Sequence, residues 1–336
     1  MNNKLFSIKP PLLVKFGAAL LFILIVPGFT NDYSMQVLNV SLIMAILSFG
    51  LSILLGMGGM LTFAGTAFMG LGAYIVANLA TGRLGYILNT SESLMIAMIV
   101  CALVSFLIGL ILLRLKGTFF TFATIALVQV SWSIYMNYKP FTGGPDGISR
   151  IPALAVFGFS PNGYKEWFYL LAVIVLVCIV IVERIRSTKL GRSLAAVRDN
   201  EIAAQCLGVN IYRTKVIAFT IAGALSALAG GLFAMHGGFI SADNFTFDMA
   251  TTYIIIVMLG GVNDTFGVLV GALLVNMLPE WLRPLARYIR LIYGIGVILL
   301  MVFMPMGLAG LMKQGIEKCK LKIKKEAVSD EAHTRA

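Results

Sequence analysis

The side chains best equipped for directed polar contacts lie in the loop 184–215, which separates two long apolar runs. A charged side chain at the centre of a bilayer costs at least about 2.5 kcal/mol, so this loop must lie in water. Charges next to small residues are suited to contact with another protein. The residues expected to make that contact are Arg198, Asp199, Asn200, Glu201, Ala203, Ala204 and Gly208.

Capping residues predict two short helices within this loop. Ser193 and either Asp199 or Asn200 offer N-cap side chains, and Gly208 offers a helix end. A short helix with an apolar strip and flanking charges fits a groove on a partner protein. We therefore expect a docking site, with a plain solvated connector as the alternative. The apolar strip would consist of Ile202, Cys206 and Leu207.

A second set of polar side chains, all uncharged, lies in the apolar run 118–137. It consists of Thr118, Thr121, Thr124 and Gln129. At about 100° per residue these four positions fall within an arc of about 140° on a helix. Such a stripe offers hydrogen bonds to a small zwitterion or amide without trapping a charge, and marks a candidate translocation path. The alternative is that the threonine hydroxyls bond to carbonyls of their own helix.

The loop 138–166 holds a third candidate, a run of turn-forming residues. It comprises Thr142, Gly143, Gly144, Pro145, Asp146 and Gly147. Consecutive Gly and Pro residues of this kind predict tight turns. We expect either a structural turn or a gate and docking rim for an outside partner.

Motifs for catalysis are missing from the sequence. There is no G-x-x-x-x-G-K-[ST], G-x-S-x-G or H-E-x-x-H pattern, so no nucleotide hydrolysis or zinc chemistry is expected. The four cysteines form no C-x-x-C, and His236 and His333 are far apart in sequence, so neither a metal site nor a disulfide framework is expected. No carboxylate lies deep in an apolar run, as a proton-driven carrier would require. The chain is therefore expected to be neither an enzyme nor cofactor-dependent.

The composition of the chain indicates that these residues are carried by membrane-spanning helices. Hydrophobic residues make up 59% of the chain and charged residues 12%, against about 25% charged in soluble domains. We expect an all-α polytopic membrane protein with about ten spans, each near the length that crosses a bilayer. The runs are 16–30, 37–55, 60–80, 94–113, 118–137, 167–182, 216–236, 249–262, 267–281 and 289–305.

The distribution of positive charge sets the expected orientation. With both termini in the cytoplasm, 19 of the 26 Lys and Arg fall on the inside, which is a positive-inside bias. The basic excess is thus topological and does not indicate nucleic-acid binding. Arg283, Arg287 and Arg290 are the exception, since this arrangement leaves them outside. The first run lacks a small-x-small cleavage pattern, so it is expected to remain as a span rather than a cleaved signal peptide.

Two domains follow from this arrangement. Residues 1–312 are expected to form one transmembrane domain, and 313–336 a basic cytoplasmic tail that attracts anionic lipid. Small residues at four-residue steps predict close helix contacts, either within the fold or at a subunit interface. One run carries two adjacent rows, Gly223, Ala227 and Gly231 in one and Ala222, Ser226, Gly230 and Ala234 in the other, and a further run carries Gly267 and Gly271.

The segment 191–210 resembles the permease subunits of branched-chain amino-acid ABC importers of the LivM type. That family carries approximately G-R-x-x-x-A-[IV]-R-[DE]-[ND]-E-x-A-A-x-x-x-G-[IV]-[ND], which is matched here from Gly191 and Arg192 to Gly208, Val209 and Asn210. Glycine patterns near 54–74, 114–126, 142–148 and 258–272 add to the resemblance, which covers roughly 40–285. The sequence departs from the family at 263–266, where relatives commonly show Gly-Ser followed by Pro or Gly.

The resemblance implies an ABC-importer permease fold in a bacterial inner membrane. It also implies several partners: two P-loop ATPase subunits on the cytoplasmic side, a second homologous permease, and a secreted substrate-binding protein. Branched-chain amino acids (leucine, isoleucine and valine) are the expected substrates. Urea and short-chain amide permeases share this architecture, so they remain an alternative. A stand-alone secondary carrier and an integral membrane enzyme are the alternatives from other classes.

Overall fold

The computed structural model describes residues 31–281 except 84, 86, 116, 156–159 and 162. Several predictions fall outside the described residues. They are the first and last apolar runs (16–30 and 289–305), the basic cluster of Arg283, Arg287 and Arg290, and the tail 313–336. The total of ten spans and the side of the termini therefore stay predictions.

Apolar helices occupy the positions of the second to the ninth expected runs. Those long and apolar enough to cross a membrane are α2 (Asp32–Leu51) with its π-helical continuation η1 (Ser52–Met57), α4 (Thr90–Leu112), α5 (Thr118–Asn137), α7 (Tyr164–Ser187) and α10 (Ile211–Gly237). The shorter ones are α3 (Gly65–Thr81), α11 (Phe247–Gly260) and α12 (Thr265–Trp281). The chain is thus mostly helical, as expected of a polytopic membrane protein.

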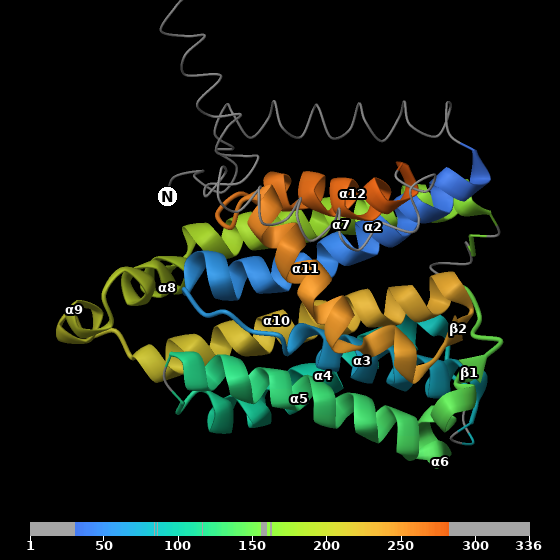
Figure 1. Ribbon diagram of the computed structural model, residues 1–336, viewed down its shortest axis with the longest axis horizontal. Coiled ribbons are helices and arrows are strands. Elements are labelled where there is room, and N and C mark those ends of the chain that lie inside the picture. Colours follow the sequence, from blue (N-terminus) through green and yellow to red (C-terminus); the bar gives the residue numbers. More distant parts are fainter. Residues whose placement is uncertain are drawn as a thin grey trace, which may run out of the picture.

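Short elements lie at the two ends of the long helices (Figure 1). At one end are α8 (Lys189–Asp199) and α9 (Glu201–Cys206). The other end carries α6 (Lys139–Thr142), η2 (Gly144–Asp146), β1 (Ile148–Ser149), β2 (Phe239–Ile240) and η3 (Ala242–Phe245). β1 and β2 pair antiparallel with Ile148 opposite Ile240. We call these the docking end and the loop end.

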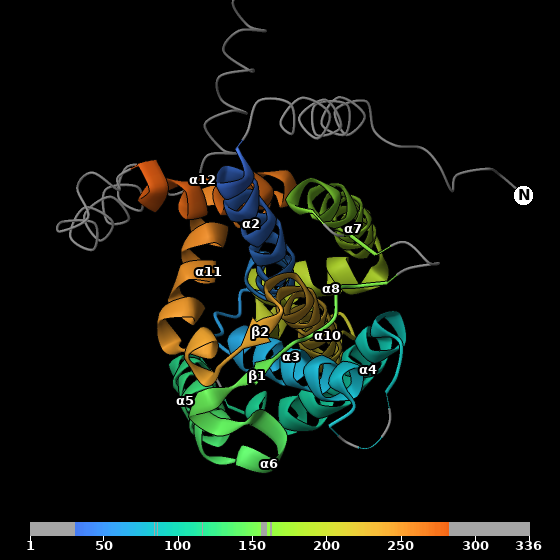
Figure 2. The ribbon, with the colours of Figure 1, turned by 90° about the vertical axis from the view of Figure 1, so that its right-hand side faces the viewer.

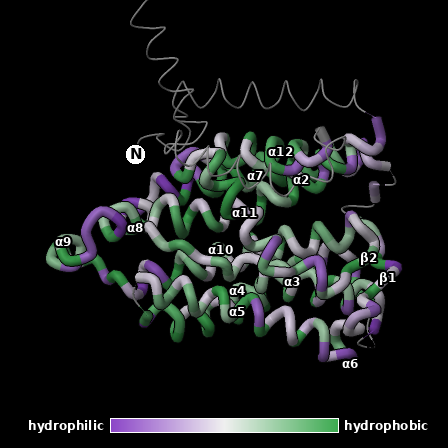
Figure 3. Tube along the Cα trace, in the orientation of Figure 1, coloured by the Kyte–Doolittle hydropathy of each residue, from purple (hydrophilic) through white to green (hydrophobic). Residues whose placement is uncertain are grey.

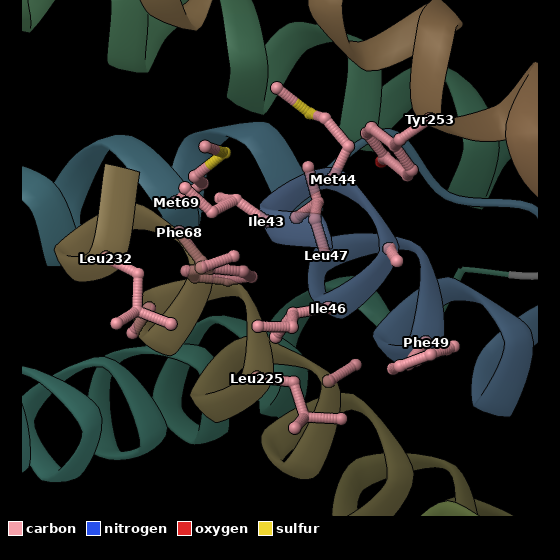
Figure 4. Packing of buried hydrophobic residues seen from close by; sticks show 14 of the residues in the cluster. Ile43, Met44, Ile46, Leu47, Phe49, Phe68, Met69, Leu225, Leu232 and Tyr253 are labelled. Atoms are coloured by element: carbon pink, nitrogen blue, oxygen red, sulfur yellow. The ribbon is translucent and has the colours of Figure 1, made fainter. Parts of the chain in front are cut away.

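The long helices form two groups. α2, α7 and α12 pack together, and α3, α4, α5 and α10 form the other group, with α11 between them (Figure 1). Viewed along the long axis, α10 lies near the middle and contacts α2 as well as α3 and α4 (Figure 2). Ile46 and Phe49 of α2, Phe68 of α3 and Leu225 of α10 meet in the buried core between the groups (Figure 4).

Close backbone contact lets α10 occupy this central place. A Cβ on Gly230 would lie 1.9 Å from the carbonyl oxygen of Met69, and one on Gly231 would lie 2.4 Å from Leu94. Ala227 faces Gly72 in the same contact, and Gly223 faces Ser105. The small ridges of α10 therefore lie against α3 and α4 of this same chain. Gly267 and Gly271 likewise touch the backbone of α11, at Gly260 and Ile256.

The outer surfaces of the helices carry the large apolar side chains that contact with a bilayer requires. α4 exposes large apolar side chains along its length, including Met95, Ile99, Leu103 and Ile111. Hydrophilic residues gather instead toward the docking end and the loop end (Figure 3). A broad exposed apolar surface is costly in water, so lipid is the natural solvent for this face.

Candidate docking site and translocation path

The docking segment, which we define as 189–208, follows directly from α7. α8 begins after Thr188, so Ser193 lies inside the helix and the prediction that it caps the helix is wrong. Asn200 does cap α9, since its Oδ1 accepts a hydrogen bond from the backbone N–H of Ala203 at 3.0 Å. Gly208, with φ of +81°, follows the end of α9 in a conformation that favours glycine. The two short helices expected from the sequence are present.

The first of these helices is fastened to the transmembrane domain. Leu194 and Val197 of α8 are buried. Gly191 approaches the end of α7 so closely that a Cβ would lie 2.5 Å from the carbonyl oxygen of Arg186. α8 is thus part of the packed body of the protein.

The second helix presents apolar surface to its surroundings. Ile202 is 76% exposed, Leu207, the C-cap residue of α9, is 82% exposed, and the Cys206 thiol is exposed beside them. Ala203 is exposed as well, whereas Ala204 is buried against its own chain. The small size of Ala204 is therefore required by packing within this protein.

Three charged residues of the docking segment, Arg198, Asp199 and Glu201, have partners inside the chain. The carboxylate of Glu201 pairs with the ammonium group of Lys215 on α10. The Oδ1 of Asp199 accepts hydrogen bonds from Nε and Nη2 of Arg198 at 3.1 and 3.0 Å. The Nη1 of Arg198 donates to the carbonyl oxygen of Gly56 at 2.7 Å and to Oδ1 of Asn263 at 3.2 Å. The sequence grouped Arg198 with Glu201, but its guanidinium is turned toward the transmembrane domain.

A cavity of about 370 Å³ opens beside the docking segment. Its wall includes the turn 58–61, the start of α5 with Thr121, and the residues 197–201 with Lys215. The volume is within the range of about 300–1,000 Å³ typical of small-molecule sites. The cavity thus joins one member of the threonine stripe to the docking segment.

The threonine stripe on α5 divides into two parts. Thr121 donates to the carbonyl oxygen of Leu61 at 3.2 Å, and Thr124 accepts from the backbone N–H of Phe63 at 3.2 Å while donating to the carbonyl oxygen of Thr121. These two side chains hold the extended connection between η1 and α3, which no sequence pattern predicted. Thr118 and Gln129 are exposed on the outer face of α5.

The turn at 142–147 is a well-bonded structure at the loop end. Thr142 accepts from the N–H of Gly144 at 3.1 Å and donates to the carbonyl oxygen of Tyr138. Gly143, Gly144 and Gly147 all have positive φ, and a Cβ on Gly147 would lie 2.1 Å from the carbonyl oxygen of Ile240. Pro145 and Asp146 are exposed.

A buried amide that no sequence motif marked joins α6, which leads into this turn, to α3. Both hydrogen bonds of the Asn78 Nδ2 group, to the carbonyl oxygens of Tyr74 and Phe141, measure 2.7 Å. Its only signal was a polar residue late in an apolar run. Within the residues that the structure describes, no group of three or more His, Cys, Asp and Glu is placed to hold a metal ion.

Apolar helices with lipid-type outer faces, joined by a structured polar segment at one end, are typical of a polytopic membrane protein. The chain belongs to the family described as the permease component of the branched-chain amino acid transport system, whose pattern matches residues 33–304. The resemblance drawn from the docking motif is thereby confirmed.

Curated relatives cover most of the chain. It is 32% identical over 317 residues to the high-affinity branched-chain amino acid transport system permease protein LivM of Salmonella typhimurium strain LT2, covering 87% of this chain and 74% of that protein. The corresponding protein of Escherichia coli K12 is 30% identical over 328 residues, covering 91% and 75%. The autoinducer 2 import system permease protein LsrC of E. coli O9:H4 is 26% identical over 264 residues, covering 76% and 74%. No solved structure matches the chain.

Proposed function

We propose that this permease imports leucine, isoleucine and valine across a bacterial inner membrane, driven by ATP hydrolysis on separate subunits. The observation that carries the proposal is the match to the two LivM proteins over 87% and 91% of this chain. The alternative substrates are urea and short-chain amides. A family that also includes an autoinducer 2 import permease does not restrict its substrates to amino acids.

The exposed apolar residues of α9 supply the contact with the ATPases. Ile202 and Leu207 stand out in water at the docking end, and fully burying such a side chain contributes about 1.5–3 kcal/mol. Two P-loop ATPase subunits would each offer a groove of the kind that accepts a short amphipathic helix, one to this chain and one to its partner permease. In this arrangement the docking end lies in the cytoplasm, and the predicted ten spans would put both termini on the same side.

The outer face of α5 supports a second homologous permease as the neighbour of this chain. Gln129 lies near the middle of α5 and is exposed, as are Thr118 and Ser133. An amide without a hydrogen-bond partner in hydrocarbon costs several kcal/mol, roughly 4–8 in a medium that cannot hydrogen-bond. A partner permease across this face would enclose Thr118 and Gln129 in a polar path, whereas α4 would remain in lipid. Thr121 and Thr124 would shape the inner mouth of the path through the connection that they hold.

The loop end then faces outward and receives the secreted substrate-binding protein. The hydrogen bonds of Thr142 and the close approach of Gly147 to Ile240 hold the turn in place. Pro145 and Asp146 are exposed on it and would form part of the rim. A preformed rim suits a partner that must release its substrate at one defined place.

The test is uptake by proteoliposomes that contain this chain, its partner permease and the two ATPases, with the binding protein outside and ATP inside. We expect ATP-dependent uptake of radiolabelled leucine that unlabelled isoleucine and valine suppress and urea does not. Suppression by urea alone would establish the amide alternative. Uptake by this chain without the ATPases would establish a secondary carrier.

A further inference from the structure

Three segments that are distant in sequence meet at the docking end. Arg198 lies at the end of α8, Gly56 within η1, and Asn263 in the turn between α11 and α12. The Nη1 atom of Arg198 joins all three, because it donates at 2.7 Å to the Gly56 carbonyl oxygen and at 3.2 Å to Asn263 Oδ1. The docking segment therefore holds a direct polar contact to two parts of the transmembrane domain.

The contact at Gly56 has a physical reason in the geometry of η1. A π-helical turn shifts the usual backbone bonding pattern, and the last carbonyl groups of any helix need partners from elsewhere. Here the N–H groups of Gly58 and Met60 both donate to Leu54, and that of Gly59 donates to Leu55. The carbonyl of Gly56 accepts from the guanidinium instead. A cation is favoured at this end of a helix, where the macrodipole is negative.

The arginine side chain packs closely against the turn that follows η1. A Cβ on Gly59, which has φ of +66°, would lie 2.8 Å from Cγ of Arg198. A Cβ on Gly56 would lie 2.2 Å from the carbonyl oxygen of Val262, so the two turns also touch each other. Asp199 accepts from two further nitrogens of the same guanidinium and fixes its plane.

The structure assigns Arg198 the role of a positioning residue that passes movement of the docking segment to η1 and to the α11–α12 turn. This inference rests on the proposed function, in which the ATPases move that segment. η1 continues α2, and α2 packs against α7, α10, α11 and α12. Displacement of α8 would therefore shift the most enclosed helix of the transmembrane domain through a bonded contact. Arg198 acts in coupling, and α9 supplies the binding surface.

The experiment compares variants of the fully assembled transporter in proteoliposomes. Arg198→Ala removes all the guanidinium contacts, Arg198→Lys keeps one donor, and Asn263→Ala removes one acceptor from an exposed turn. Arg192→Ala is the matched control, because Arg192 lies on the same helix and donates to the carbonyl oxygen of Ser187. Three quantities are measured: ATPase subunits bound, ATP hydrolysed, and leucine imported per ATP.

We expect Arg198→Ala to bind the ATPases and hydrolyse ATP near the wild-type rate while importing about tenfold less leucine per ATP, a typical size for coupling between sites. Asn263→Ala should show a smaller loss, Arg198→Lys should recover part of the import, and Arg192→Ala should match the wild type. A purely structural role would lower all three quantities together.

Besides a joint fall of all three quantities, two results would overturn the inference while leaving the proposed function standing. One is import per ATP at the wild-type level in both Arg198→Ala and Asn263→Ala. The other is loss of bound ATPases in Arg198→Ala, which would make Arg198 a docking anchor. If Arg198→Ala fails to fold, Asn263→Ala and Arg198→Lys decide by the same ratio. A wild-type chain that binds no ATPase would instead refute the proposed function.

Discussion

α8 and α9 are neighbours in one polar loop and yet differ in what they contact. α8 buries Leu194 and Val197 in the transmembrane domain, while α9 leaves Ile202 and Leu207 exposed. Both helices carry apolar side chains and charges, so composition does not separate them. The difference indicates that one helix belongs to the body of the permease and the other is available to a partner. Docking and coupling can thus be assigned to adjacent helices.

The largest expected effect comes from removing the apolar surface of α9. Replacing Ile202 and Leu207 together by Asp should weaken ATPase binding at least about 100-fold, since exposed apolar residues of this kind form the centre of interfaces. Co-purification of the ATPases with the affinity-tagged permease measures the loss, and uptake should disappear with it. The thermal stability of the isolated chain should stay unchanged. Full retention of the ATPases would show that α9 is a solvated connector.

A pair of leucines tests the comparison directly. Leu194→Ala should lower the free energy of unfolding by about 2–5 kcal/mol, the usual cost of emptying a buried leucine site. Leu207→Ala should change it by less than about 0.5 kcal/mol and should weaken ATPase binding instead. Thermal denaturation of the detergent-purified chain and ATPase co-purification measure the two effects. The assignment of the two helices fails if both variants lose stability equally.

Charge reversal at Glu201 sharpens the role of the ion pair. Glu201→Lys should leave the fold intact, because a partly exposed pair contributes about 0.2–1 kcal/mol, but should reduce ATPase binding and uptake. Lys215→Glu added to it restores an ion pair of reversed polarity. If Glu201 contacts the ATPase by its charge, the double variant stays defective in co-purification. Recovery by the double variant would mean that the pair acts within this chain alone.

The smallest perturbation is chemical labelling of Cys206. This thiol is exposed, whereas Cys101 and Cys178 are buried, so a Cys319→Ala chain should react with a membrane-impermeant maleimide at Cys206. We expect reaction in inside-out vesicles, none in right-side-out vesicles, and protection when the ATPases are bound. Reaction from the outside would reverse the orientation that the positive-inside bias predicts. Adding Cys206→Ser to the Cys319→Ala chain provides the unlabelled control.

The helices were largely predictable from the sequence. A long apolar run favours the hydrocarbon of a bilayer whatever the rest of the chain does, so each run predicts a span independently. The run 118–137 matches α5 residue for residue. The run 60–80 is an instructive difference, because α3 begins only at Gly65. Its first residues form the extended connection that Thr121 and Thr124 hold, and hydropathy does not record such a contact.

The position of the docking segment in the chain was predictable, but most of its contacts were not. Polar residues between apolar runs located the docking segment, and Asn200 and Gly208 marked the ends of its second helix. The inward direction of Arg198 could not be deduced, because its partners lie 142 and 65 residues away in sequence. Such contacts depend on how the helices pack.

The sequence by itself determined the solvent of each segment, the order of the helices and the family, because apolar length, charge and the docking motif are local properties. Tertiary structure alone decided which face of each helix is covered. It decided that the small residues of α10 pack against α3 and α4. It also decided that Thr121 and Thr124 of α5 bond to the η1–α3 connection while Thr118 is exposed, and that Arg198 bonds to Gly56 and Asn263. The physical reason is that hydrogen-bond partners and close backbone contacts exist only once distant segments have packed together.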